Sequence, residues 1–147
     1  KKMATTTATI TLSSSDLLSQ PISLSKTMTL YKDQTTATGL EQMNYHRAII
    51  PTGTAFDLIP ESAALANNSN YVYIVNKNTD VTDFVVITIL GEVIGSLYGG
   101  DFLFIPWNCD LTAADTDSTI EIQANTHDCT IEYALFHVGE TLVTQAD

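Results

Sequence analysis

Positive charge is scarce in this sequence. Its 147 residues include 6 Lys and Arg against 17 Asp and Glu, which gives a net charge of −11 at pH 7. Arg47 is the single arginine. A phosphate backbone or an anionic lipid surface is bound by clustered basic side chains, so we expect neither nucleic acid nor a membrane as a partner. Such acidity suits solubility at high local concentration, or a basic or cation-binding partner.

Long apolar runs are also missing. A membrane-spanning helix needs about 18–20 consecutive apolar residues. The longest candidate, Phe84–Leu97, is interrupted by Gly91, Glu92 and Gly95. No hydrophobic region of a signal peptide is visible near the N-terminus, and Met3 is expected to be the natural start. We therefore expect no spanning helix.

Cysteine is represented only by Cys109 and Cys129, and no CxxC motif occurs. Two cysteines in a chain of this length do not make a disulfide framework. The sequence leaves two alternatives open, free thiols or a single bridge, because the distance between the two residues cannot be read from it.

Catalytic and metal-binding motifs are absent as well. His46, His127 and His137 are not at metal-ligand spacing. Gly95-Ser96-Leu97 lacks the GxSxG pattern of a nucleophile elbow, and no glycine-rich phosphate loop is present. Cys129 could meet a histidine only through the tertiary fold. We expect no enzyme, and assign no catalytic, cofactor-binding or metal-binding residue.

Two acidic segments are candidates for cation binding. Asp80 and Asp83 form one pair. Hard oxygen ligands, which Ca²⁺ prefers, gather in a second segment, although not at EF-hand spacing: they are Asn108, Asp110, Asp115 and Asp117. The alternative is ordinary turn and cap chemistry, since Asp and Asn favour both.

A carboxylate pair and a group of aromatic residues are two further candidates. Glu121 and Glu132 are expected to face each other across the last hairpin with Asp128 nearby, as a glycosidase pair would, or to be solvated outer residues. A platform of flat rings could bind carbohydrate, or the same rings could fill the core or a subunit contact. The aromatic candidates are Tyr71, Tyr73, Tyr98, Phe102 and Trp107.

Ten short segments carry the signature of strands, with alternating or continuous apolar residues between turn signals. Gly91-Glu92 is predicted to be a type II′ hairpin turn, and Tyr98–Asp101 a second turn. Residues 16–18 and 60–68 allow short helical turns. The predicted strands are Ala4–Leu12, Ile22–Tyr31, Glu41–Ile50, Thr54–Ile59, Tyr71–Val75, Phe84–Leu90, Val93–Leu97, Phe102–Pro106, Thr119–Ala124 and Cys129–Val138.

This pattern predicts an all-β protein, an antiparallel β-sandwich of jelly-roll-like type. Short connections favour hairpins between consecutive strands, so Tyr71–Trp107 is expected to be a meander at the centre of the sheet. We expect an N-terminal strand or arm at residues 1–20, the sandwich at 21–139 and a tail at 140–147.

Three segments resemble a known family. They are Tyr71–Asn76 (YVYIVN), Leu97–Pro106 (LYGGDFLFIP) and Ile131–Tyr133 (IEY). Their pattern is similar to small all-β structural proteins encoded in the virion gene blocks of tailed phages. The chain departs from it at Tyr98-Gly99, where such proteins often have a Pro-Gly turn. The resemblance implies a non-enzymatic virion component, such as a capsid decoration (cement) protein or a head or tail accessory protein, and carries over no catalytic residue.

On this basis we expect a decoration protein located in the virion and assembled in the host cytoplasm. Its partners would be the major capsid protein or other virion proteins, and copies of itself in a homo-oligomer such as a trimer. Contacts are expected at Ala4–Leu12, which could add to a neighbour's sheet by β-augmentation, at Lys32–Gly39 and at Asn108–Ser118. The alternative is a carbohydrate-binding module or viral adhesin, which needs exposed aromatic rings.

Overall fold

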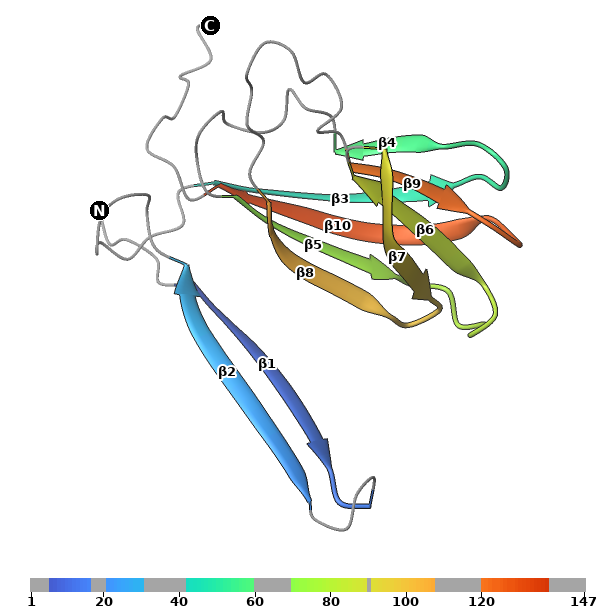
Figure 1. Ribbon diagram of the computed structural model, residues 1–147. Helices are drawn as coiled ribbons and strands as arrows, with labels where there is room; N and C mark the ends of the chain where they lie inside the picture. The colour runs from blue at the N-terminus through green and yellow to red at the C-terminus, as the bar shows by residue number, and fades with distance from the viewer. Residues whose placement is uncertain are drawn as a thin grey trace, which may run out of the picture.

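The computed structural model describes residues 6–16, 21–30, 42–59, 70–89, 91–107 and 120–137. These residues form ten strands and no helix (Figure 1). The strands are β1 (Thr6–Ser14), β2 (Ile22–Leu30), β3 (Gln42–Ile50), β4 (Phe56–Ile59), β5 (Asn70–Asn76), β6 (Phe84–Ile89), β7 (Glu92–Tyr98), β8 (Phe102–Trp107), β9 (Ile120–Ala124) and β10 (Cys129–His137).

Two four-stranded antiparallel sheets pack against each other as a β-sandwich, which confirms the predicted fold class. One sheet has the order β3-β10-β5-β8 and the other β4-β9-β6-β7. Alternate residues of each strand turn inward, since side chains of a strand point to opposite faces in turn. The largest fully buried side chains of the core between the sheets are Ile50, Ile59, Val72, Ile74, Val85, Ile87, Ile120, Ile122 and Ile131.

The strands of the sandwich pair in a nested way. β6 pairs with β7, β5 with β8, β4 with β9 and β3 with β10, so each pair encloses the one before it. Two further pairings, β5 with β10 and β6 with β9, join these ribbons side by side. The chain therefore changes sheet at each step from β3 to β6 and again from β7 to β10.

The predicted meander through Tyr71–Trp107 is wrong. β5 and β8 belong to one sheet and β6 and β7 to the other. Only β6–β7 is a hairpin within this stretch. A short turn permits either a hairpin or a crossing to the opposite sheet. Inward and outward residues alternate in the same way in both cases, so the alternation of apolar residues does not distinguish a hairpin from a crossing.

The two predicted turns differ in outcome. Ile89 pairs with Glu92, so the β6–β7 connection is residues 90–91, one residue earlier than Gly91-Glu92. Gly91 has a φ of 75°, which glycine adopts without strain. The turn after β7 is confirmed, because the Asp101 amide donates to the Tyr98 carbonyl at 2.9 Å, but it leads from one sheet to the other.

β1 and β2 form a separate hairpin, called the arm below, that stands away from the sandwich in Figure 1. All nine residues of β1 pair in register with β2. We expected the arm to end at residue 20, whereas the pairing places Ile22–Leu30 with the arm and outside both sheets. The expected helical turn at 60–68, most of that at 16–18, the loops at 32–39 and 108–118, and the tail at 140–147 lie outside the described residues.

Candidate functional site

The outer side of the β3-β10-β5-β8 sheet is the first candidate surface, and we call it the aromatic face. The strand registers place its residues opposite one another across four strands. They alternate with buried residues such as Val72 and Ile74, and so point away from the core. The face consists of Met43, Tyr45, Arg47 and Ile49 on β3, Thr130, Glu132, Ala134 and Phe136 on β10, Tyr71, Tyr73 and Val75 on β5, and Phe102, Phe104 and Pro106 on β8.

Rings contact one another across the strands of this face. Tyr71 stacks on Phe104 with ring centroids 5.6 Å apart and planes 9° from parallel. Phe104 also meets Phe136 edge-on at 6.3 Å, and Tyr73 meets Phe102 at the same distance. Such pairs hold one another in place while their outer surfaces stay open, and Phe102 remains 58% exposed. The face is therefore a firm apolar platform.

Glu132 is the only carboxylate on the aromatic face. Arg47 Nη2 lies 3.2 Å from its Oε1, and Lys77 Nζ lies 3.5 Å from its Oε2. A hydrogen bond from the Tyr45 hydroxyl lowers the pKa of Glu132, and the two cations lower it further. The same hydrogen bond raises the pKa of Tyr45. The carboxylate is thus held charged and fully partnered, which suits a positioning role and not proton transfer.

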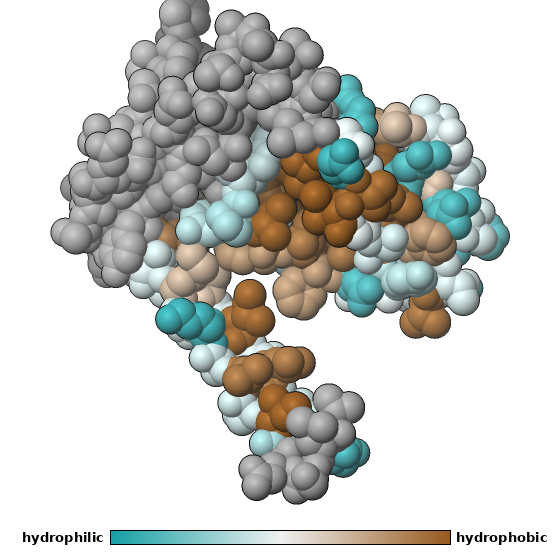
Figure 2. Space-filling model, viewed as in Figure 1, coloured by the Kyte–Doolittle hydropathy of each residue, from teal (hydrophilic) through white to brown (hydrophobic). Residues whose placement is uncertain are grey.

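The arm has two chemically different faces. One carries only hydroxyl side chains, and Thr9 and Thr27 hydrogen-bond there at 2.9 Å. The opposite face is apolar, with Leu12 paired to Leu24 and Ile10 paired to Lys26. Figure 2 shows the apolar side chains along this hairpin. The hydroxyl face consists of Thr7, Thr9, Thr11, Ser13, Ser23, Ser25, Thr27 and Thr29.

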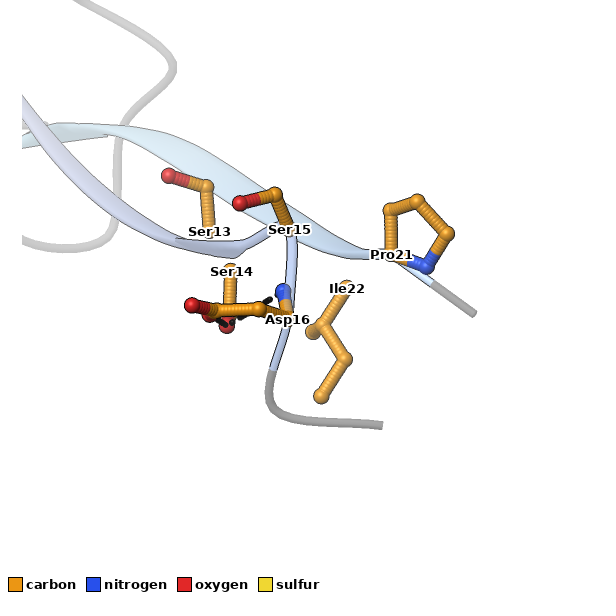
Figure 3. Close-up of a pocket in the computed structure, with 6 residues that line it drawn as sticks. All are labelled: Ser13, Ser14, Ser15, Asp16, Pro21 and Ile22. Carbon is orange, nitrogen blue, oxygen red and sulfur yellow. Dashed lines mark hydrogen bonds between the residues drawn. The ribbon is translucent and has the colours of Figure 1, made fainter. Parts of the chain in front are cut away.

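An open hollow of about 500 Å³ lies at the tip of the arm. Figure 3 shows that Ser14 and Asp16 point to one side of the strand, and Ser13 and Ser15 to the other. The Ser14 hydroxyl donates to an Asp16 carboxylate oxygen at 3.2 Å. This is turn chemistry at a strand end, and with one carboxylate it is a weaker candidate than the aromatic face. The hollow is lined by Ser13, Ser14, Ser15, Asp16, Pro21 and Ile22.

A polar cluster closes one end of the sandwich. Asn76 is fully buried, and its amide nitrogen donates to the carbonyls of Asp83 and Leu97 at 3.2 and 3.1 Å. Asn78 donates to the Asp83 carboxylate at 2.9 Å and accepts from the Thr130 amide at 2.9 Å. These two asparagines satisfy main-chain groups that no strand pairs, so they tie the ends of both sheets together.

His127 and Asp83 form an ion pair within this cluster. His127 Nδ1 lies 2.7 Å from Asp83 Oδ1, and this contact raises the pKa of the imidazole. Cys129 is a free, buried cysteine whose thiol donates to the His127 main-chain carbonyl at 3.4 Å, not to the ring. Burial raises the pKa of this thiol. The group resembles part of a nucleophilic site, but it lacks the thiol–imidazole contact that activates a cysteine.

The proposed carboxylate pair does not form. Because β9 and β10 belong to different sheets, Glu121 and Glu132 are not partners across a hairpin. Glu121 pairs with Asp57 and Thr88, whereas Glu132 lies on the aromatic face. The last two strands had been expected to be neighbours because only a short turn separates them.

The aromatic candidates separate into three places. Tyr71, Tyr73 and Phe102 come together on the aromatic face. Tyr98 contacts Phe84 on the other sheet, with ring centroids 5.0 Å apart. Trp107 is only 4% exposed and packs in the core, where its indole Nε1 has no hydrogen-bond partner among the described residues. A carbohydrate platform on this chain would therefore not include Trp107.

The other candidates do not assemble into a site. His46 contacts the ring of Tyr133 at 5.4 Å, and Asp80 accepts from the Thr82 amide and hydroxyl. Within the described ranges no group of three His, Cys, Asp or Glu residues could hold a metal ion, and no helix could cross a membrane. Cys109 and the acidic segment Asn108–Asp117 lie outside the described residues, as does the side chain of His137.

Two features of the fold are not predicted from the sequence. β3 and β10 each have two alternating rows of side chains, and which row faces solvent depends on the sheet that each strand joins. Asn76 and Asn78 follow a predicted strand, where asparagine is an ordinary turn residue. The signal that could have found the first is that aromatic residues stand at alternate positions within a strand, as Tyr71 and Tyr73 do on β5 and Phe102 and Phe104 do on β8.

Comparison of the chain with protein-family models, with curated proteins and with solved structures finds no match.

Proposed function

We propose that the chain is a structural subunit of a tailed-phage virion, a decoration protein that binds and stabilises the shell without catalysis. The observation that carries this proposal is the pair of apolar surfaces that the sandwich leaves uncovered, the aromatic face and the apolar side of the arm. Surfaces of this kind mark contacts with other proteins. The segment resemblance described above suggests the partner class.

We also propose that the sandwich is a jelly roll. In support, its two sheets contain four nested antiparallel pairs, which is how a long ribbon of two strands rolls into two sheets. Jelly rolls are frequent in viral capsid proteins and in lectins. Fold alone does not identify function, so the proposal depends on the two surfaces.

Binding to the shell tests the virion role. The purified chain is mixed with shells of the virus that encodes it, and we expect it to sediment with them at a fixed ratio to the capsid protein. Decorated shells should also withstand a higher temperature before they disrupt. A chain that stays in the supernatant at saturating concentration would contradict the proposal. Leu24→Asp on the apolar side of the arm should lower the amount that sediments with the shells, whereas Ser23→Asp on the hydroxyl face should not.

A carbohydrate-binding module or adhesin is the second candidate. The exposed ring of Phe102, beside the half-buried ring of Tyr73, favours it, since sugars stack on flat exposed rings. A glycan array with the intact chain tests this function. A hit that Phe102→Ala abolishes, and that Val93→Ala on the other sheet leaves unchanged, would support it. The absence of any hit would leave the virion role as the better proposal.

A further inference from the structure

The arm carries an apolar face that no other part of the described chain covers. Leu12 and Leu24 pair directly across the hairpin and are 60% and 61% exposed, and Ile10 beside them is 51% exposed. An isolated two-stranded hairpin is at best marginally stable in water. Its apolar side needs a partner surface, and the position of the arm in Figure 1 shows that the chain's own sandwich does not supply it.

The aromatic face is the largest surface that could receive such an arm. Its rings are held by contacts with one another, so little order has to be gained on binding. β3 and β10, like β1 and β2, are each nine residues long. A two-stranded ribbon of that length matches β3 and β10, and extends past β5 (7 residues) and β8 (6 residues) by two or three residues.

Repulsion between carboxylates does not oppose this pairing. The chain has a net charge of −11, so two copies repel each other over most of their surfaces. The aromatic face is an exception, since Glu132 is its one carboxylate and has Arg47 and Lys77 beside it. Lys26 is the one charged residue in β1 and β2, and it lies on the apolar side of the arm. The arm can thus meet the face without opposing carboxylates.

We propose that the apolar side of the arm of one copy packs on the aromatic face of a second copy. This contact joins two different surfaces of the chain. Every arm and every aromatic face is covered only in a closed assembly, which is either a dimer with two reciprocal contacts or a ring. The inference concerns copies of this chain alone. It uses the same two surfaces that carry the virion role, but the mass of the purified chain tests it without shells, so failure of one can be told from failure of the other.

The expected size of the contact agrees with a closed assembly. At about 3.3 Å per residue and about 10 Å across two strands, one side of the arm covers roughly 300 Å² of each partner. A single arm contact would bury roughly 600 Å² in total, less than the ~1,200 Å² at which stable interfaces begin. Two reciprocal contacts reach that value, so an open pair held by one arm is not expected.

The first test is the mass of the full chain in solution, measured by light scattering at about 100 μM, well above a micromolar dissociation constant. We expect the mass of an oligomer, that is, of two or more copies of the 16.0 kDa chain. Leu24→Asp should shift the protein to monomer or raise the dissociation constant at least tenfold. The matched control is Ser25→Asp, one residue away on the hydroxyl face, which should leave the mass unchanged.

A second pair of variants tests the receiving surface. Phe102→Asp on the aromatic face should also produce monomer, whereas Val93→Asp, which is 67% exposed on the other sheet, should not. Circular dichroism on each variant checks that the sandwich is folded. A wild-type monomer at this concentration, or equal effects of both members of a pair, would overturn the proposal.

Crosslinking identifies what the arm contacts. The photoreactive residue p-benzoyl-phenylalanine replaces Leu24 in an equal mixture of ¹⁴N and ¹⁵N chains. We expect mixed-isotope crosslinks to peptides that contain Tyr71–Val75 or Phe102–Phe104. Crosslinks found only within one isotope, with no mixed-isotope species, would mean that the arm folds back on its own sandwich, and crosslinks between two arms would mean a different interface. Either outcome refutes the exchange between copies.

Discussion

The side-chain amide of Asn76 joins the two sheets of the sandwich, because it donates to the main-chain carbonyl of Leu97 at 3.1 Å. Asn76 lies on β5 and Leu97 on β7, in opposite sheets. The same nitrogen donates to the Asp83 carbonyl, and the Asn76 carbonyl oxygen accepts from the Asn78 amide at 3.1 Å. One buried side chain therefore satisfies three main-chain groups where the strands end.

Asn76→Ala should destabilise the fold by about 2–3 kcal/mol, since it leaves buried main-chain groups without partners. The measurement is urea unfolding followed by tryptophan fluorescence, for which Trp107 is the single reporter. Gln123→Ala, an exposed position on β9, is the control and should change stability by less than ~0.5 kcal/mol. Equal stability of the two variants would show that Asn76 does not clamp the sheets.

Gly99→Ala should destabilise the sandwich by about 1–3 kcal/mol because no space is available for a methyl group. A Cβ at Gly99 would overlap the main-chain carbonyls of Asp80 and Asn78, so the turn after β7 would have to move. Gly95→Ala is the matched control, since a Cβ there meets no atom within 4 Å. Thermal unfolding of both variants decides, and a Gly99→Ala variant as stable as Gly95→Ala would contradict the close packing.

The ion pair of His127 with Asp83 predicts a pH dependence. A raised pKa in the folded state means that the pair stabilises the fold fully below the unfolded value of about 6.5, and that this stabilisation is lost as pH rises through the folded value. The difference in unfolding free energy between wild type and His127→Gln should therefore be larger at pH 5.5 than at pH 9. A difference that grows with pH would reverse the sign and exclude the pair.

Proton NMR of the imidazole tests the same contact directly. Asp83→Asn removes the charge and leaves the main-chain carbonyl that Asn76 uses. It should bring the pKa of His127 back toward its ordinary value of about 6.5. An unchanged titration in this variant would assign the shift to Asp80 or Asp128, which also raise it.

Cys129 should react slowly in the folded protein. Its thiol is buried and burial raises its pKa, so little thiolate is present or reachable at pH 8. Alkylation by iodoacetamide, followed by peptide mass spectrometry, should be at least ~10-fold slower for the native chain than for the chain in urea. Rapid modification of native Cys129 would indicate that the end of the sandwich opens easily.

Individual strands could be predicted from the sequence, but their assignment to sheets could not. Alternation and turn residues located β6, β8 and β9 within a residue or two, since those signals are local. Whether Phe102 follows Tyr98 into the same sheet depends on contacts with strands far away in the chain, and no local pattern carries that information. The expected pairing of Glu121 with Glu132 was wrong for this reason.

The candidate surfaces were partly predictable. The shared strand face of Tyr71 and Tyr73 was predicted, and the structure confirms it. Which side of the sheet these rings and Trp107 face depends on the register between β8 and β5. That register is fixed only when the two strands pair. The role of Asn76 could not be derived, because a buried asparagine and a turn asparagine are identical in sequence.

The nested pairing also sets an order of assembly during synthesis. β1–β2 and β6–β7 join neighbouring segments and can form within microseconds once their residues leave the ribosome. β3 waits for β10, the last described strand, so the sandwich has a high contact order and closes late. Until β10 is made, β5 is paired only with β8, and β3 has no partner in this sheet. The arm can therefore form before the aromatic face is complete.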